Sequence, residues 1–132
     1  MAPANQARGR AGEYLVAFDF ASRGYSTMIN PDPTSPYDVL VDAGKEKILK
    51  IQVKATRAAQ VQNGWVSYKF QLGRRRDRYH HVDVYAFVAL DTKAIWYCRP
   101  KELPATSSTI SIPPKRFQAK VLDSLEALLS SL

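Results

Sequence analysis

The chain has 132 residues, of which 45% are hydrophobic, so one folded domain with a packed core is expected rather than a disordered chain. It carries 19 Lys and Arg against 12 Asp and Glu, and the resulting charge of +7 favours a polyanionic partner. No apolar run approaches the roughly 18 residues of a membrane span, and residues 1–10 lack the apolar centre of a signal peptide. We therefore expect a cytoplasmic protein, in a cell or in an infected host, with no membrane partner.

A helix is predicted over residues 5–23, with Gly24 as its C-terminal stop. It carries two neighbouring stripes, one formed by Ala11, Leu15, Phe18 and Ser22 and the other by Glu13, Ala17 and Phe20. A short strand is expected over residues 25–29. The prolines at 31, 33 and 36 predict a loop over residues 30–36, because proline excludes regular structure there.

Two alternating runs follow, over residues 37–42 and 47–56, and residues 43–45 form a plausible turn between them. The first run places Asp38 on the face opposite Val39 and Val41. The second run has apolar side chains on one face and polar ones on the other, the polar set being Lys50, Gln52, Lys54 and Thr56. The two runs therefore predict a hairpin.

Further strands are predicted downstream. Residues 65–72 are rich in strand formers and follow Asn63-Gly64, whereas residues 83–90 are nearly all apolar, as in a strand covered on both faces. Other expected segments are a basic connector over 73–78, a turn at 91–93, a strand over 94–98, a helical turn at 100–103, and a loop or edge strand over 105–114.

A final helix is predicted from Lys115 to about residue 131. Its apolar stripe is Phe117, Val121, Leu125, Leu128 and Leu132, widened by Leu122 and Leu129. Core packing is the favoured explanation for so broad a stripe, and burial against a second copy of the chain is the alternative. Cys98, Trp65 and Trp96 are expected in the core, and the single thiol suggests a reducing compartment.

The order of these elements predicts one domain over residues 1–132, an α/β or α+β fold with a sheet flanked by helices.

The hairpin brings together side chains that suit a hard cation. Asp38 offers a carboxylate, Gln52 an amide oxygen and Val53 its backbone carbonyl, and Glu13 can add a carboxylate directly or through water. Lys54 points to the same face, where its ammonium can bind a phosphate oxygen or orient water. An isolated pattern of this kind is also found on solvated strands, so a solvent-exposed hairpin that binds no metal is the alternative.

Basic residues surround this candidate site and predict contacts with phosphates. Four arginines lie in the connector, and further candidates flank the site along the chain: Arg74, Arg75, Arg76 and Arg78, then Arg8, Arg10, Lys50, Thr56 and Arg57. A solvated charged face is the alternative. Tyr79 and Asp83 are expected to anchor the connector to the sheet. His80 and His81 are adjacent and point apart in an extended chain, so a zinc site is not expected.

Gly12-Glu13, Gly24-Tyr25, Ser35-Pro36-Tyr37-Asp38 and Gln52-Val53-Lys54 resemble the motifs of the PD-(D/E)XK nuclease superfamily. The resemblance covers residues 8–90 and is greatest to archaeal-type Holliday junction resolvases and to small endonucleases encoded by group I introns. It implies a restriction-endonuclease-like core with a central mixed sheet, and Mg²⁺-dependent hydrolysis of phosphodiester bonds in DNA, with Mn²⁺ as a substitute.

By position, the resemblance assigns the helix carboxylate to Glu13, the central metal ligand to Asp38 and the catalytic lysine to Lys54. Gln52 stands where most of the superfamily has Glu or Asp, and the intron-encoded group resembles this chain in having Gln. That change removes one negative charge and should weaken metal binding. Ser35 is expected to be a turn residue, with phosphate contact as the alternative suggested by some resolvases.

These observations predict a metal-dependent endodeoxyribonuclease of a prokaryotic cell or phage-infected host, acting on branched or duplex DNA. A Holliday junction resolvase with a role in DNA recombination is the first expectation, and a site-specific homing endonuclease is the second. Either activity suits a homodimer or homotetramer, to whose interface the helix over 115–131 could contribute. The expectation from another class is a non-catalytic DNA-binding module built on a nuclease fold.

Overall fold

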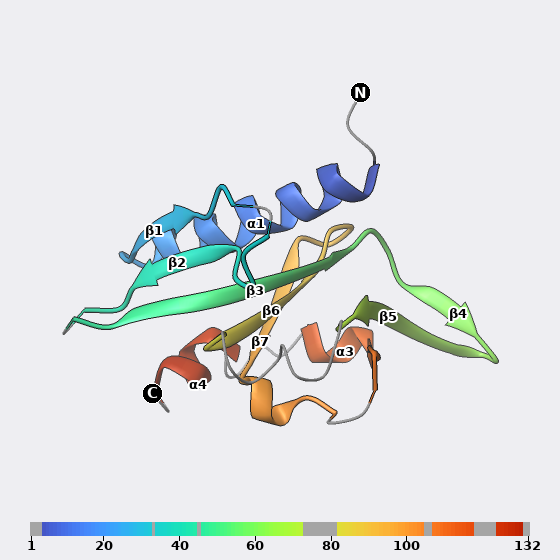
Figure 1. Cartoon of the computed structure of the whole chain (residues 1–132). Coiled ribbons are helices and arrows are strands. Elements are labelled where there is room, and N and C mark those ends of the chain that lie inside the picture. The colour runs from blue at the N-terminus through green and yellow to red at the C-terminus, as the bar shows by residue number, and fades with distance from the viewer. Residues whose placement is uncertain are drawn as a thin grey trace.

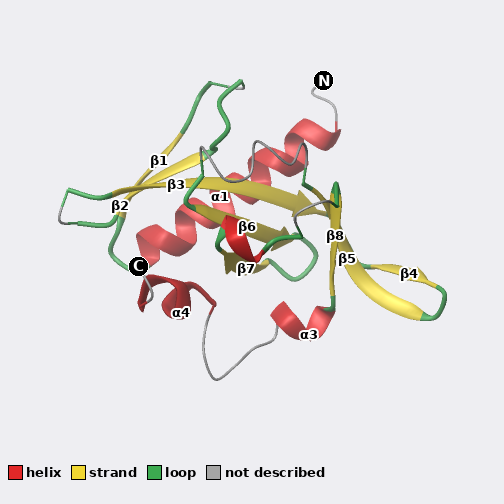
Figure 2. Ribbon diagram, turned by 60° about the horizontal axis from the view of Figure 1, so that its bottom comes forward, coloured by secondary structure: helices red, strands yellow, loops and turns green. Residues whose placement is uncertain are grey.

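The structure of the protein is a computed structural model that describes residues 4–32, 34–44, 46–72, 82–104, 107–117 and 124–130. Two sheets form its framework (Figures 1 and 2). The larger has the strand order β1-β2-β3-β6-β7, with bounds Ser26–Ile29, Val39–Asp42, Ile48–Thr56, Val84–Ala89 and Ala94–Cys98. The smaller has the order β4-β5-β8, with bounds Gln60–Gln62, Trp65–Gln71 and Thr109–Ile112.

The larger sheet is mixed. Strand β3 pairs antiparallel with β2 and parallel with β6, while β6 pairs antiparallel with β7. The helix α1 (Ala4–Ser22) lies across one face, as Figure 1 shows, and α4 (Ser124–Ser130) packs beside β7. A 3₁₀ turn, η1 (Pro100–Glu102), and the short helix α3 (Pro114–Phe117) complete the described elements. The predicted mixed sheet flanked by helices is confirmed, as is the hairpin formed by β2 and β3.

Strand β6 supplies side chains to two hydrophobic cores. Val84, Ala86 and Val88 pack with α1, β2, β3 and α4, whereas Tyr85 and Phe87 pack with β5, β8 and α3. All six residues of β6 are buried. The nearly continuous apolar run in the sequence follows from this position between two cores.

The buried face of α1 differs from the predicted stripe. Val16 and Phe20 are fully buried and Gly12 lies against β3, whereas Phe18 is 70% exposed. A Cβ built on Gly12 would come within 2.9 Å of the Ala55 Cβ, so the missing side chain lets α1 lie close to β3. The face that contacts the sheet is therefore organised around a glycine, which a hydrophobic pattern does not mark. Gly24 ends the helix as expected, with φ of 95°.

The C-terminal segment is also different from the prediction. Phe117 of α3 packs against Tyr68 and Phe70, whereas Leu128 of α4 belongs to the other core. The two residues therefore do not share one apolar stripe, and Leu128 packs within the chain. Val121, Leu122 and Leu132 lie outside the described residues.

The two tryptophans expected in the core differ in their exposure to solvent. Trp96 is partly buried and stacks on Phe87 with 5.7 Å between the ring centroids, as expected. Trp65, at the start of β5, is 79% exposed, so the prediction of a core position is wrong. The strand β4 was not expected, and it extends the β5 hairpin beyond the second core (Figure 2).

Cys98 is buried, as expected, and this burial raises the pKa of its thiol to about 12.

Candidate active site

Asp38 occupies the position just before β2, where β3 continues past the end of its neighbour. Its backbone N–H donates at 2.8 Å to the carbonyl of Ile51, the residue that pairs with Val39 at the start of β2. The Asp38 carboxylate accepts two hydrogen bonds through Oδ2, one from the Val53 backbone N–H at 2.8 Å and one from the Gln52 Nε2 at 3.0 Å. These bonds fix the carboxylate at the edge of the sheet.

The direction of the Val53 backbone places a carbonyl oxygen at the same edge of the sheet. Along a strand, the N–H and C=O of one residue point to the same side and those of the next residue to the other. Because the Val53 N–H is directed at Asp38, the Val53 carbonyl faces the same edge. Asp38, Gln52 and Val53 therefore bring a carboxylate, a carboxamide and a backbone carbonyl to the same edge.

Glu13 reaches this edge from α1. The Asp38 charge contributes to raising the pKa of Glu13, second to the burial of the Glu13 carboxyl. Arg10 lies one turn earlier and its Nη1 forms an ion pair with the Glu13 Oε1 at 3.0 Å. The close approach of α1 at Gly12 positions this carboxylate, so the helix and hairpin parts of the expected set do come together.

Burial dominates the electrostatics of Asp38. It raises the pKa of the carboxyl, against the lowering effects of the Val53 N–H, the Lys54 charge and the Arg10 charge. Two partly buried carboxylates thus lie within electrostatic range of each other and of two cations. A bound cation would relieve both the burial cost and the mutual repulsion of the carboxylates.

The oxygen donors of this group suit a hard divalent cation such as Mg²⁺. Only two of them are carboxylates, and no group of three or more His, Cys, Asp or Glu side chains forms a metal-binding cluster within the described ranges. Gln52 provides an amide where a third acidic side chain would complete such a group. In this structure its Nε2 donates to Asp38, which leaves the amide oxygen directed away from that carboxylate.

The other predicted positions divide into three groups. Ser35 orders the loop before the site, because its Oγ accepts from the Tyr37 N–H at 3.5 Å. Lys50 is exposed and places its Nζ 5.7 Å from the centre of the Tyr37 ring. The remaining described candidates lie on the first half of α1 and at the end of β3, namely Arg8, Arg10, Thr56 and Arg57.

The basic connector over residues 73–78 is not among the described residues. Arg74, Arg75, Arg76, Arg78, Tyr79, His80 and His81 lie outside the described residues. Asp83 follows them, and its Oδ2 accepts from the Lys50 backbone N–H at 2.8 Å. Of the two residues expected to anchor the connector, Asp83 therefore contacts β3.

Sequence reasoning missed two features of the site. One is the Val53 N–H, which holds Asp38 through the backbone and so leaves no trace in side-chain type. The other is the packing of Gly12 on β3. Its signal was available, since a glycine inside a helix costs about 1 kcal/mol relative to alanine and implies a packing reason.

The five-stranded mixed sheet with α1 across one face has the expected restriction-endonuclease-like fold. The chain is similar to the bacterial homing endonuclease I-Ssp6803I, with a TM-score of 0.73 and 15% identity over 99% of this chain and 94% of that one. It is also similar to Hjc, a Holliday junction resolvase from the archaeal hyperthermophile Archaeoglobus fulgidus, with a TM-score of 0.59 and 13% identity over 91% and 94%. The resemblance to PD-(D/E)XK nucleases is thus confirmed as a likeness of fold. No protein-family model and no curated protein sequence matches the chain.

No helix within the described part of the chain is long and apolar enough to cross a membrane.

Proposed function

We propose that the protein is a metal-dependent DNA endonuclease. The observation that supports this most is the convergence of Asp38, Gln52, Lys54 and Glu13 at one edge of a nuclease-type sheet. The two similar proteins named above are a homing endonuclease and a Holliday junction resolvase. The net charge of +7 adds a general attraction for the phosphate backbone.

The residues at the candidate site have different roles in the proposed hydrolysis. Asp38, Gln52, the Val53 carbonyl and Glu13 would hold a Mg²⁺ ion, or Mn²⁺ in its place. The ion, when bound, polarises the phosphoryl group and lowers the pKa of a water molecule. The Lys54 ammonium binds a phosphate oxygen or orients the attacking water, and it stabilises the negative charge that develops there. Nearby cations, among them Arg10 and Arg57, position the backbone of the DNA.

The homing endonuclease and the resolvase named above suggest two classes of DNA substrate. A linear recognition site is favoured by the likeness to the homing endonuclease, which spans 99% of this chain, and by Gln52. A four-way junction is favoured by the likeness to Hjc. Both classes suit paired active sites, and self-association as a homodimer or homotetramer stays a prediction.

A panel of DNA substrates tests the proposal. The protein is incubated with Mg²⁺ or Mn²⁺ and either a four-way junction, a linear duplex library or single strands, with chelator as control. Paired nicks across the junction identify a resolvase, and cutting at one long linear site identifies a homing enzyme. DNA binding without cleavage, also in the Gln52→Glu variant, would instead establish a non-catalytic DNA-binding module.

The Gln52→Glu variant is expected to bind Mg²⁺ about tenfold more tightly, because it adds a negative charge beside Asp38. Isothermal titration with Mg²⁺ and with Mn²⁺ measures the change. Gln6→Glu is the control, since it adds the same charge at an exposed position near the start of α1. Equal affinities for the wild type and Gln52→Glu would show that residue 52 does not bind the metal.

A further inference from the structure

The tip of the β4–β5 hairpin presents an indole to solvent. Asn63 and Gly64 connect the strands with φ of 52° and 80°, as in the tight type I′ turn, and the pairing places Gln62 opposite Trp65. Trp65 is 79% exposed and Val61, one residue before Gln62, is 73% exposed. Because Val61 pairs with Val66, it lies on the opposite face of the hairpin from Trp65, and each face exposes a large apolar side chain at a narrow tip that projects from the body of the molecule (Figure 1).

The outward face of the smaller sheet is polar. Lys69 pairs with Ser111 and Gln71 pairs with Thr109, so these four side chains alternate with the buried Phe70 and Ile112. They line a groove of about 380 Å³ together with Gln60. The Lys69 Nζ donates to the Gln62 Oε1 and so lies along the hairpin toward its tip.

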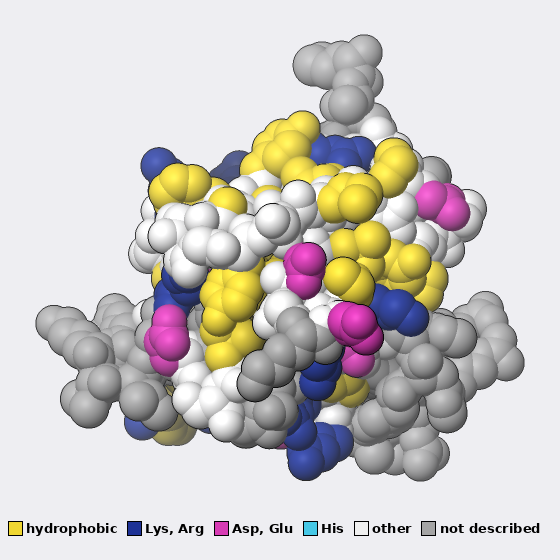
Figure 3. Space-filling model, turned by 90° about the vertical axis from the view of Figure 1, so that its left-hand side faces the viewer, with side chains coloured by type: hydrophobic (Ala, Val, Ile, Leu, Met, Phe, Trp, Pro, Cys, Tyr) yellow, Lys and Arg dark blue, Asp and Glu magenta, His cyan; other side chains and the backbone are white. Residues whose placement is uncertain are grey.

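Charge indicates what such a face would bind. Residues 56–72 and 109–112 contain no Asp or Glu, whereas Arg57 and Lys69 are both cationic. An ammonium, amides and hydroxyls without a carboxylate match the oxygens of a phosphate backbone. The opposite end of the molecule differs, because there exposed apolar side chains are interspersed with both acidic and basic ones (Figure 3).

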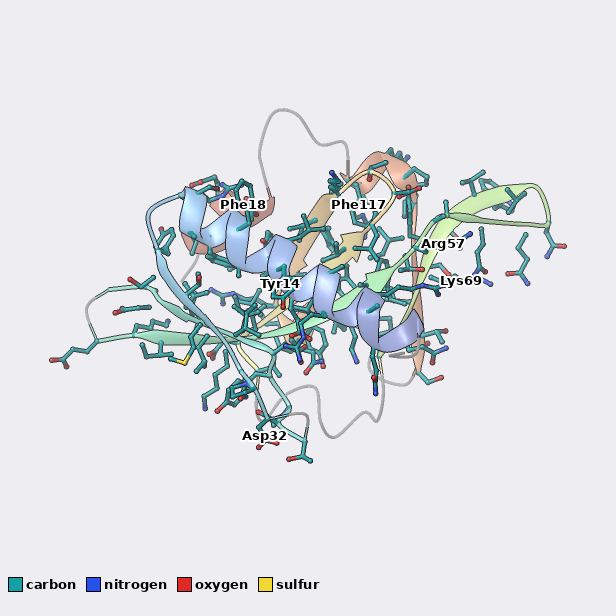
Figure 4. All side chains as sticks on the ribbon, turned by 90° about the horizontal axis from the view of Figure 1, so that it is seen from above. Tyr14, Phe18, Asp32, Arg57, Lys69 and Phe117 are labelled. Carbon is teal, nitrogen blue, oxygen red and sulfur yellow. The ribbon has the colours of Figure 1, made fainter. Side chains whose placement is uncertain are left out.

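The hairpin is also continuous with the candidate active site. Strand β3 carries Lys54, ends at Thr56 and leads through Arg57 to β4, and β5 contacts β3. Figure 4 places Arg57 and Lys69 at the same end of the molecule, where the hairpin leaves the body. A nucleic acid held at Asp38 and Lys54 can therefore extend onto this sheet.

We propose that the β4–β5 hairpin and the outward face of β5 and β8 form a second DNA-contact surface. Lys69 binds a backbone phosphate, and Trp65 stacks on a base that becomes accessible where the duplex is bent or opened. Aromatic stacking tolerates any base, so this surface would recognise deformation of the DNA rather than its sequence. The proposal rests on the proposed function, because it assumes that DNA occupies the candidate active site.

Binding by Trp65 variants provides the first test. Affinity for a labelled duplex with a central mismatch is measured by fluorescence anisotropy, with Asp38→Asn in every protein to prevent cleavage. Trp65→Ala is expected to bind roughly 5- to 100-fold more weakly, as for the loss of one stacked base, and Trp65→Phe to retain most of the affinity. The matched control is Phe18→Ala, which removes another exposed aromatic side chain on α1, away from the hairpin (Figure 4).

Fluorescence and salt dependence give independent measurements. In a Trp96→Phe background, Trp65 emission should be quenched by DNA, and more strongly by the mismatched duplex than by the paired one. Lys69→Gln should lower the slope of log affinity against log salt by about one, whereas the exposed Lys101→Gln should leave it unchanged.

The outcomes separate the two proposals. If the wild type cleaves DNA and both Trp65→Ala and Lys69→Gln bind as the parent does, the hairpin surface is refuted and the nuclease proposal stands. DNA binding without any quenching of Trp65 refutes stacking in the same way. If the wild type binds no DNA under any of these conditions, both proposals are refuted.

Discussion

Replacing Asp38 with asparagine is expected to reduce DNA cleavage by about a thousandfold or more, while DNA affinity changes only severalfold. The asparagine oxygen can still accept from the Val53 N–H, so the loop and the edge of the sheet are preserved. The negative charge needed to hold the ion is lost, and with it several kcal/mol of transition-state stabilisation. Single-turnover cleavage and anisotropy on the same DNA measure the two effects. A parallel loss of binding and cleavage would instead assign Asp38 to DNA binding.

The same substitution should also affect stability. Burial raises the pKa of Asp38, so its folded form binds a proton more readily than its unfolded form. This contribution to the free energy of unfolding is present at low pH and is lost as pH rises through the raised pKa. Asp38→Asn should therefore be more stable than the wild type at neutral pH, with a difference that shrinks in acid. Mg²⁺ should raise the melting temperature of the wild type alone.

Adding one methyl group at Gly12 is expected to destabilise the fold and to impair cleavage. The new Cβ would lie 2.9 Å from the Ala55 Cβ and 3.2 Å from the Val53 Cγ1, so α1 must move away from β3. Overpacking of this kind costs about 1–3 kcal/mol, which exceeds the gain of about 1 kcal/mol in helix propensity. Because Glu13 is the next residue, displacement by about 1 Å would also reduce cleavage, by up to about a hundredfold.

Gly9 offers a matched control on the same helix. A Cβ at Gly9 meets nothing within 4 Å, so Gly9→Ala should stabilise the protein by up to about 1 kcal/mol and leave cleavage intact. Chemical unfolding of both variants and cleavage under single-turnover conditions make the comparison. Equal stabilities for Gly9→Ala and Gly12→Ala would show that the contact between α1 and β3 tolerates a side chain.

The sequence predicted those parts of the site that depend on strand alternation. Asp38, Gln52 and Lys54 could be related because a hairpin of alternating residues fixes which side chains are neighbours. The buried face of α1 was not predictable in the same way, since apolar residues occur around much of the helix. Gly12 further concealed the contact, because it packs closely without adding hydrophobicity.

The exposure of Trp65 shows a second reason why a prediction from the sequence was wrong. Strand alternation assigns Trp65 to the face of β5 opposite the buried Phe70, but it does not tell which of the two faces is covered by a core. Phe70 lies over the second core, whereas the tip of the hairpin extends beyond it. The partner strand at the tip, β4 (Gln60–Gln62), is short and mostly polar, so it carries little strand signal of its own.

The double burial of β6 has a consequence for cooperativity. Removing this strand would open both cores at once and deprive β3, which carries Gln52 and Lys54, of its parallel partner. Neither sheet can then melt without exposing the apolar surface of the other, so the two are expected to unfold as a single unit. The candidate active site and the projecting hairpin are therefore expected to lose their structure together, although they lie in different sheets.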